Sequence, residues 1–146
     1  DEEMIVGLAR AVALAGNAHT RLYLVRNRTE VRRLPVRVWW FDDGLFVVRA
    51  QPGYEALLGA RLLRICGRPV EEVRRAVRPL YAANESWATY MSSYTMTSPE
   101  VLAGLHLCPR GAAPVVSFVG RDGRRGERCG RLRRRDRRAD LRGAPR

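Results

Sequence analysis

The sequence predicts an α+β fold: an N-terminal helix, a small β-barrel or sheet with flanking helices, and a disordered Arg-rich tail. Apolar side chains recur at helical spacing in residues 4–15, at strand spacing in residues 36–41, and at helical spacing again in residues 70–80. Residues 121–146 hold 12 arginines against four acids and only two large aliphatic side chains. That segment cannot bury enough apolar surface to offset the entropy lost on ordering, so we expect it to be disordered.

The chain is expected to begin with an amphipathic helix. Acidic residues occupy its first turn, where they suit the positive end of the helix dipole, and Gly16-Asn17 can end it. Residues 19–25 follow as a candidate strand, and residues 26–33 as a polar loop or exposed connection. The apolar face of the helix is predicted to consist of Met4, Ile5, Leu8, Val12 and Ala15.

Three strands are predicted between positions 36 and 65. Alternating side chains mark the first strand, and Asp43-Gly44 supplies a residue pair that tolerates the positive φ angles of a two-residue hairpin turn. Residues 45–50 form the second strand. A short helical turn with Tyr54, Leu57 and Leu58 on one side leads to the third strand, at residues 60–65.

Helices and one further strand complete the predicted order. Residues 70–80 form a helix, Asn84 can cap a second, and Ser98-Pro99 is a strong start for a third that Gly104 can end. Residues 114–119 are predicted to be the final strand. We expect the ordered chain to end near Gly120, and the Arg, Gly and Pro bias beyond it is typical of GC-rich codons read out of frame. The apolar face of the second helix is predicted to hold Trp87, Tyr90, Met91 and Tyr94.

The charge distribution and the apolar runs argue against two classes of function, nucleic-acid binding and membrane spanning. All 27 basic residues are arginines, the net charge is +12, and two thirds of the excess comes from the last 26 residues. Arginines neutralise phosphates, but the tail has no aromatic residue for base stacking, so we do not expect nucleic acid as a partner. No apolar run reaches the length of about 18 residues that a membrane span needs.

Cysteine and histidine spacing predicts no metal site and no cofactor. Cys66, Cys108 and Cys129 lack Cys-x-x-Cys spacing, and we expect them to be buried or incidental thiols. His19 and His106 are too far apart in sequence for a spacing argument.

Five segments appear in an order that resembles a known family: residues 16–22 (GNAHTRL), LPVRVWWFDDGLFVV, LLGARLLRICGRPVEEV, NESWATYM and TSPEVLAGL. Together they resemble the N-terminal half of tail-specific (C-terminal processing) serine peptidases, with the closest likeness to the tricorn-like branch. The resemblance covers residues 4–120. It implies an N-terminal helix and strand of the peptidase core at 1–33, a PDZ-like domain at 34–83 and a helical connector with a strand at 84–120, ahead of the 121–146 tail.

The resemblance also implies a function. Members cleave peptides or unfolded protein C-termini, and a histidine in a Gly-x-x-His context after a helix activates the nucleophilic serine. Here that position is His19, and an imidazole that titrates near neutrality suits the role of general base. The serine lies in a Gly-rich helix start downstream, and none of this chain's five serines has such a context: Ser86, Ser92, Ser93, Ser98 and Ser117. We therefore expect this chain to hydrolyse nothing without its missing peptidase core.

A different function is a non-catalytic PDZ-like peptide-binding module with an Arg-rich tail. In such modules an extended peptide adds to a sheet edge, and backbone N–H groups capture its terminal carboxylate. The stretch Asp43-Gly44-Leu45-Phe46 loosely resembles a carboxylate loop, but the simple hairpin interpretation is favoured. Trp39, Trp40 and Phe41 are interpreted as core or interdomain contacts.

Overall fold

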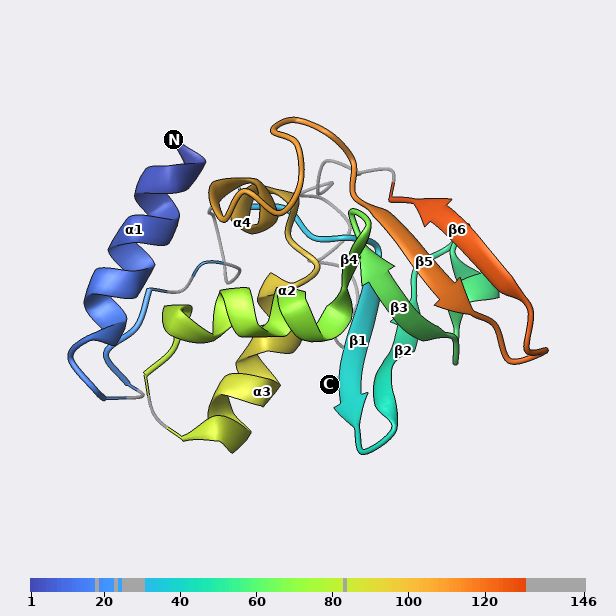
Figure 1. The fold of residues 1–146 in the computed structure, drawn as a ribbon, viewed down its shortest axis with the longest axis horizontal. Helices are drawn as coiled ribbons and strands as arrows, with labels where there is room; N and C mark the ends of the chain where they lie inside the picture. The colour runs from blue at the N-terminus through green and yellow to red at the C-terminus, as the bar shows by residue number, and fades with distance from the viewer. Residues whose placement is uncertain (18, 23, 25–30, 83, 131–146) are drawn as a thin grey trace, which may run out of the picture.

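The computed structural model describes residues 1–17, 19–22, 24, 31–82 and 84–130 (Figure 1). The predicted α+β class is confirmed. The helices lie together on one side of the sheet in Figure 1. In chain order the elements are α1 (Glu2–Ala13), β1 (Val36–Phe41), β2 (Gly44–Ala50), η1 (Glu55–Leu57), β3 (Arg61–Ile65), β4 (Arg68–Pro69), α2 (Val70–Val77), η2 (Arg78–Leu80), α3 (Glu85–Thr95), α4 (Pro99–Gly104), β5 (Val115–Val119) and β6 (Arg125–Cys129).

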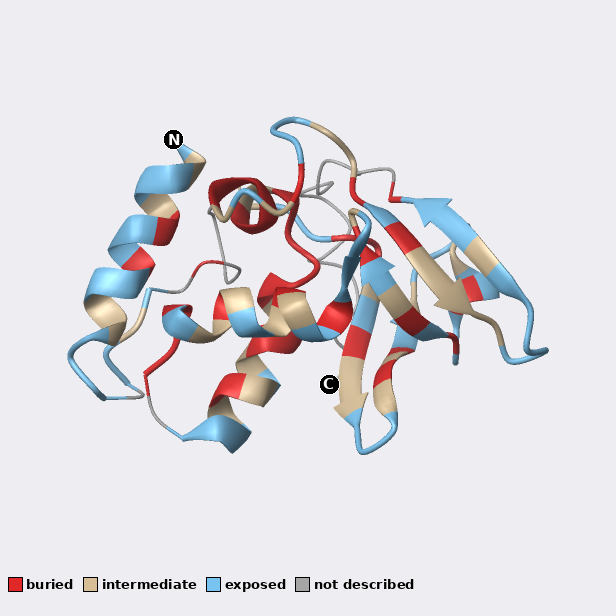
Figure 2. Ribbon diagram, viewed as in Figure 1, coloured by how far each residue is buried: buried red, intermediate tan, exposed pale blue. Residues whose placement is uncertain are grey.

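One antiparallel sheet organises the fold. Its strand order is β1-β2-β3-β5-β6, with β4 paired to β3. Strands β1, β2, β3 and β5 each bury one or two side chains, which Figure 2 marks in red. These inner side chains include Val38, Leu45, Leu62, Ile65 and Val116, each at most 2% exposed. The sheet therefore has one apolar face under the helices and one outer face.

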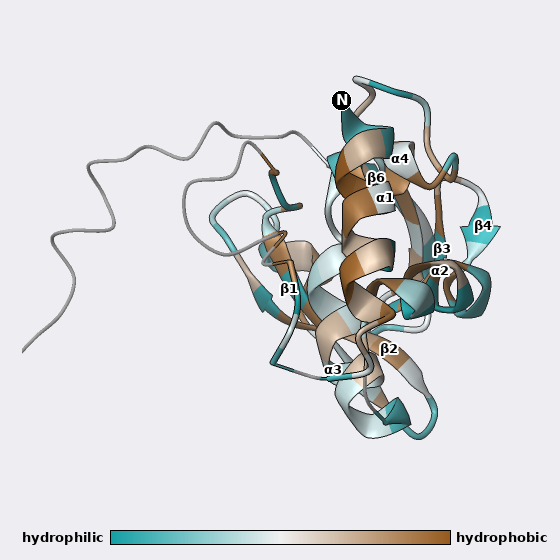
Figure 3. Cartoon of the chain, turned by 90° about the vertical axis from the view of Figure 1, so that its left-hand side faces the viewer, coloured by the Kyte–Doolittle hydropathy of each residue, from teal (hydrophilic) through white to brown (hydrophobic). Residues whose placement is uncertain are grey.

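The predicted apolar face of α1 is wrong in part. Val6 and Ala9 are the buried residues of α1, whereas Met4 and Leu8 are 59% and 52% exposed. Helix α1 packs against α4, where a side chain at Gly104 would come within 2.5 Å of the Glu2 carbonyl oxygen. This close approach selects the Val6–Ala9 stripe and leaves a second apolar stripe of α1 outside, which is seen in Figure 3.

The first hairpin forms as predicted, but its turn lies one residue earlier. Phe41 pairs with Gly44, so Asp42-Asp43 are the two loop residues. The positive φ of 143° is at Gly44, at the start of β2. The short helical turn is confirmed as η1, and Gly59, which follows it, has a φ of 77°.

The candidate strand at residues 19–25 is not present in its described part. Residues 19–22 and 24 form turns and irregular chain instead. Their backbone hydrogen bonds are local: the N–H of Thr20 donates to the Asn17 carbonyl, and that of Leu24 to the Leu22 carbonyl. Residues 23 and 25–30 lie outside the described part of the chain.

The three later helices confirm their predicted starts. The Asn84 side chain accepts from the Trp87 N–H, and the Ser98 side chain accepts from the Val101 N–H. The buried face of α3 differs from the prediction, because Tyr90 is exposed and the small residues Ala88, Ser92, Ser93 and Thr95 are buried. The hydroxyls of Ser92, Ser93 and Thr95 donate to carbonyls three residues earlier, so each buried hydroxyl has a hydrogen-bond partner inside the helix.

Ordered structure continues beyond Gly120, which corrects the predicted end of the fold. Strand β6 pairs with β5 from Val119↔Arg125 to Val115↔Cys129. Backbone pairing does not need apolar side chains, and the Phe118 ring covers Gly126 closely enough to meet any added Cβ. Residues 131–146 of the predicted disordered tail lie outside the described residues.

The expectation for the cysteines is wrong for two of them. Cys66 and Cys108 form a disulfide, while Cys129 is a free, exposed thiol. The bond joins the turn between β3 and β4 to the segment after α4. In the described part of the chain, no helix is long and apolar enough to cross a membrane.

Candidate functional site

His19 lies in an exposed turn after α1. Its backbone N–H donates to the Asn17 side-chain oxygen at 2.9 Å, and the residue is exposed. The Asn17 side chain therefore fixes the backbone at the histidine, while the imidazole remains accessible to a partner.

Four of the five serines make structural hydrogen bonds. Ser92 and Ser93 donate to carbonyls of their own helix, and Ser98 caps α4. The Ser117 hydroxyl donates to Glu127 at 2.9 Å, and Ser86 is an exposed residue near the start of α3. None of these hydrogen bonds involves a histidine.

Helix α3 lies along the outer edge of β1, on the side away from β2 (Figure 1). Successive strand residues point to opposite faces, and α3 contacts residues of both. The Trp39 ring meets the Tyr90 ring edge-on with centroids 5.6 Å apart, and the Trp40 indole N–H donates to the Ser92 hydroxyl at 3.2 Å. The helix therefore packs at the β1 edge of the sheet, one of the two edges to which an extended peptide could add.

Helix α2 holds α3 from the other side. The Arg74 guanidinium donates to the Thr89 hydroxyl at 2.6 Å and lies 5.1 Å from the centre of the Trp40 ring. The Arg74 side chain of α2 thus contacts both α3 and β1. An extended peptide could pair with the free edge of β1 only if α3 moved away.

The segment before β1 holds a carboxylate of the chain itself. The Arg32 backbone N–H donates to Glu100 at 2.8 Å, and the Arg32 guanidinium donates to the other carboxylate oxygen at 2.6 Å. The Glu100 side chain is only 13% exposed. Two residues on, the Leu34 N–H donates to the Thr97 carbonyl. Sequence spacing gave no signal for this long-range contact.

Replacing Glu100 with glutamine should lower the free energy of unfolding by about 1–2 kcal/mol, because charge-assisted hydrogen bonds to a nearly buried carboxylate are lost. Urea denaturation measures the change. The matched control is Glu72→Gln, whose ion pair with Arg68 is exposed on both sides and should contribute about 0.5 kcal/mol or less. Equal effects of the two substitutions would contradict the special role of Glu100.

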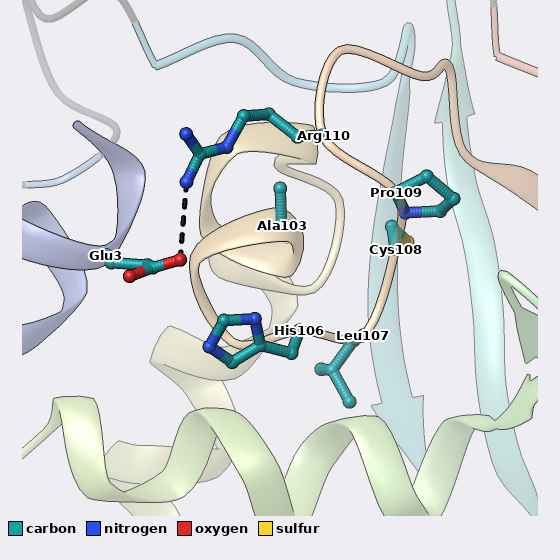
Figure 4. Close-up of a pocket in the computed structure, with 7 residues that line it drawn as sticks. All are labelled: Glu3, Ala103, His106, Leu107, Cys108, Pro109 and Arg110. Atoms are coloured by element: carbon teal, nitrogen blue, oxygen red, sulfur yellow. Dashed lines mark hydrogen bonds and ion pairs between the residues drawn. The ribbon is translucent and has the colours of Figure 1, made fainter.

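An open hollow of about 400 Å³ lies between α1 and the segment after α4 (Figure 4). It contains His106, which has a φ of 58°. Arg110 on its rim is paired with Glu2 at 2.8 Å and with Glu3 at 3.3 Å, as well as with Asp1. Because the acids of α1 neutralise this arginine, the hollow presents no free cation to an anionic ligand. Among the described residues, no group of three or more histidine, cysteine or acidic side chains could hold a metal ion.

Comparison with known proteins finds a likeness to a solved structure. No protein-family description matches the chain, and no curated protein matches it in sequence. Among solved structures, a crystal structure of a mutant of CPAF matches with a TM-score of 0.63 and 19% sequence identity, over 92% of this chain and 25% of that chain. CPAF is a serine protease that is similar to tail-specific proteases. The chain thus spans about a quarter of the length of that structure and shares the fold of that part.

Proposed function

We propose that this chain is the N-terminal part of a serine-type peptidase of the tail-specific kind, in the tricorn-like branch. The observation that carries the proposal is the likeness of its fold to a quarter of CPAF, which covers nearly the whole chain. The family resemblance of the sequence points to the same class. In this proposal the substrates are peptides or protein C-termini, and a separate core supplies the nucleophilic serine.

The exposed side of α1 supports a docked core. Met4, Leu8 and Leu14 are 59%, 52% and 89% exposed, an unusual concentration of apolar surface for one short segment. His19 follows this helix closely in the chain. A core that covered the apolar stripe of α1 would therefore also lie near the imidazole, and His19 would act there as the general base.

The alternative function, a non-catalytic PDZ-like module, has less support. It requires a free sheet edge, and at the β1 edge α3 contacts the side chains of Trp39 and Trp40. The peptidase proposal therefore requires fewer rearrangements of the structure than the peptide-binding module, for which α3 would have to move.

Labelling with a fluorophosphonate, which reacts with activated serines, tests the proposal. We expect the full gene product to contain a Gly-rich, serine-bearing core and to be labelled, whereas residues 1–146 alone should stay unlabelled. The measurement is fluorescence of the labelled protein band. A gene that encodes no such core would contradict the proposal, and so would labelling of the isolated chain.

A further inference from the structure

We propose that the outer face of the sheet binds an acidic segment of another protein. The surface that carries this inference combines aromatic rings with arginines from three strands and one helix. We call it the aromatic–arginine face, and it consists of Arg37, Trp39, Phe46, Arg49, Arg61 and Tyr90.

The strand register places these side chains in rows on one face. Trp39 pairs with Phe46, and Phe46 pairs with Arg61, so one row crosses β1, β2 and β3. Arg37 pairs with Arg49 in a neighbouring row. Residues paired across strands project to the same side of a sheet, and the intervening residues, such as Val38, are the buried ones. Tyr90 of α3 extends the same surface beside Trp39.

The face is accessible and has the composition of a binding surface. Its three arginines are exposed, Trp39 and Phe46 are half-buried, and Tyr90 is 36% exposed. Tryptophan, tyrosine, phenylalanine and arginine are the residue types enriched in protein interfaces and in their energetic hot spots. Phe41, 52% exposed, continues the apolar surface at the end of β1.

Its positive charge is not neutralised within the described chain. Arg37 stands directly opposite Arg49, an arrangement of like charges that costs free energy. In the described part of the chain, ion pairs form at other arginines, and none joins Arg37, Arg49 or Arg61 to a carboxylate. Carboxylates of a partner would relieve this repulsion and form charge-assisted hydrogen bonds.

Contacts within the chain position two of the three arginines of the face, Arg37 and Arg61. The Arg37 guanidinium donates to the Tyr94 hydroxyl at 3.0 Å. The Arg61 side chain lies over Gly44, where an added Cβ would meet its Nε atom at 2.7 Å. Because a guanidinium that is already positioned loses less entropy on binding, these contacts favour recognition of carboxylates.

The packing of the rings favours protein over nucleic acid. Trp39 and Tyr90 meet at 76°, and Phe41 and Phe46 meet at 82°, so each pair is edge-to-face. In such a pair one ring face is covered by the edge of the other ring. Base stacking needs open ring faces, whereas an acidic protein segment needs apolar contacts flanked by cations.

Binding of a short labelled peptide of glutamate and leucine tests the inference by fluorescence anisotropy. The test variant is Arg37→Gln/Arg49→Gln, and the matched control is Arg10→Gln/Arg75→Gln, which removes the same charge from exposed arginines of α1 and α2. We expect the test variant to bind about tenfold more weakly than the native chain. The control should bind within about twofold of the native chain, because Arg10 and Arg75 lie outside the aromatic–arginine face.

The indole signals in an NMR spectrum locate the contact. The Trp39 indole signal should shift when the peptide is added, whereas that of Trp40, which donates to Ser92, should stay in place. Both double variants should unfold cooperatively, and neither unfolding midpoint should fall below that of the native chain. Equal weakening in the two variants would overturn the inference, as would no binding of the peptide. If an oligothymidine of the same length bound more tightly than the peptide and through the same arginines, the face would be a nucleic-acid site and not a site for an acidic protein segment.

Discussion

Replacing Cys66 and Cys108 with serine should lower the free energy of unfolding by about 2–4 kcal/mol. The disulfide joins residues 42 positions apart and therefore restricts the unfolded chain strongly. In the folded chain it ties the β3–β4 turn to the segment after α4, two parts of the molecule with no other covalent link nearby. Removing it enlarges the unfolded ensemble.

Urea denaturation with and without a thiol reductant measures this effect. The reductant should bring the native chain to the stability of the Cys66→Ser/Cys108→Ser variant and should leave that variant unchanged. Cys129→Ser is the matched control, since Cys129 is exposed and unbonded, and its unfolding midpoint should match that of the native chain. A native chain that is insensitive to the reductant would contradict the stabilising role.

Local features of the fold could be predicted because their causes lie within a few residues. The hairpin of β1 and β2, the helical turn η1 and the starts of α3 and α4 follow from turn and capping residues. Asn84 and Ser98 act through hydrogen bonds to N–H groups three positions ahead. Such short-range rules do not depend on what the rest of the chain does.

Features that depend on long-range packing escaped prediction. The Cys66–Cys108 bond needs two loops to meet in space, and no spacing rule signals that meeting. The buried stripe of α1 is chosen by Gly104, far away in sequence. Strand β6 forms because backbone pairing with β5 outweighs its polar composition. Each outcome is set by a partner that the local sequence does not contain.

The candidate site also combines a feature that the local sequence predicts with contacts that depend on long-range packing. The position of His19 after a helix could be predicted from its local Gly-x-x-His context, and the structure places it in an exposed turn. Ser92, which accepts from the Trp40 side chain of β1, and Glu100, which accepts from Arg32 before β1, both lie far from those partners in sequence. A carboxylate held by a backbone N–H and a guanidinium is therefore visible only in three dimensions.

The proposed role of His19 predicts the largest effect on activity. In the full gene product, His19→Ala should slow peptide hydrolysis by about 100- to 10,000-fold, the range that a general base contributes. The free energy of unfolding should change by less than about 0.5 kcal/mol, because the histidine is exposed. Its backbone N–H, which donates to Asn17, is kept by alanine.

A matched substitution of the second histidine separates catalysis by His19 from a general effect of losing a histidine. His106→Asn is this control, because asparagine tolerates the left-handed backbone of that position, where φ is 58°, and its hydrolysis rate should stay native. A His19→Ala variant that hydrolyses peptides at the native rate would show that another group accepts the serine proton.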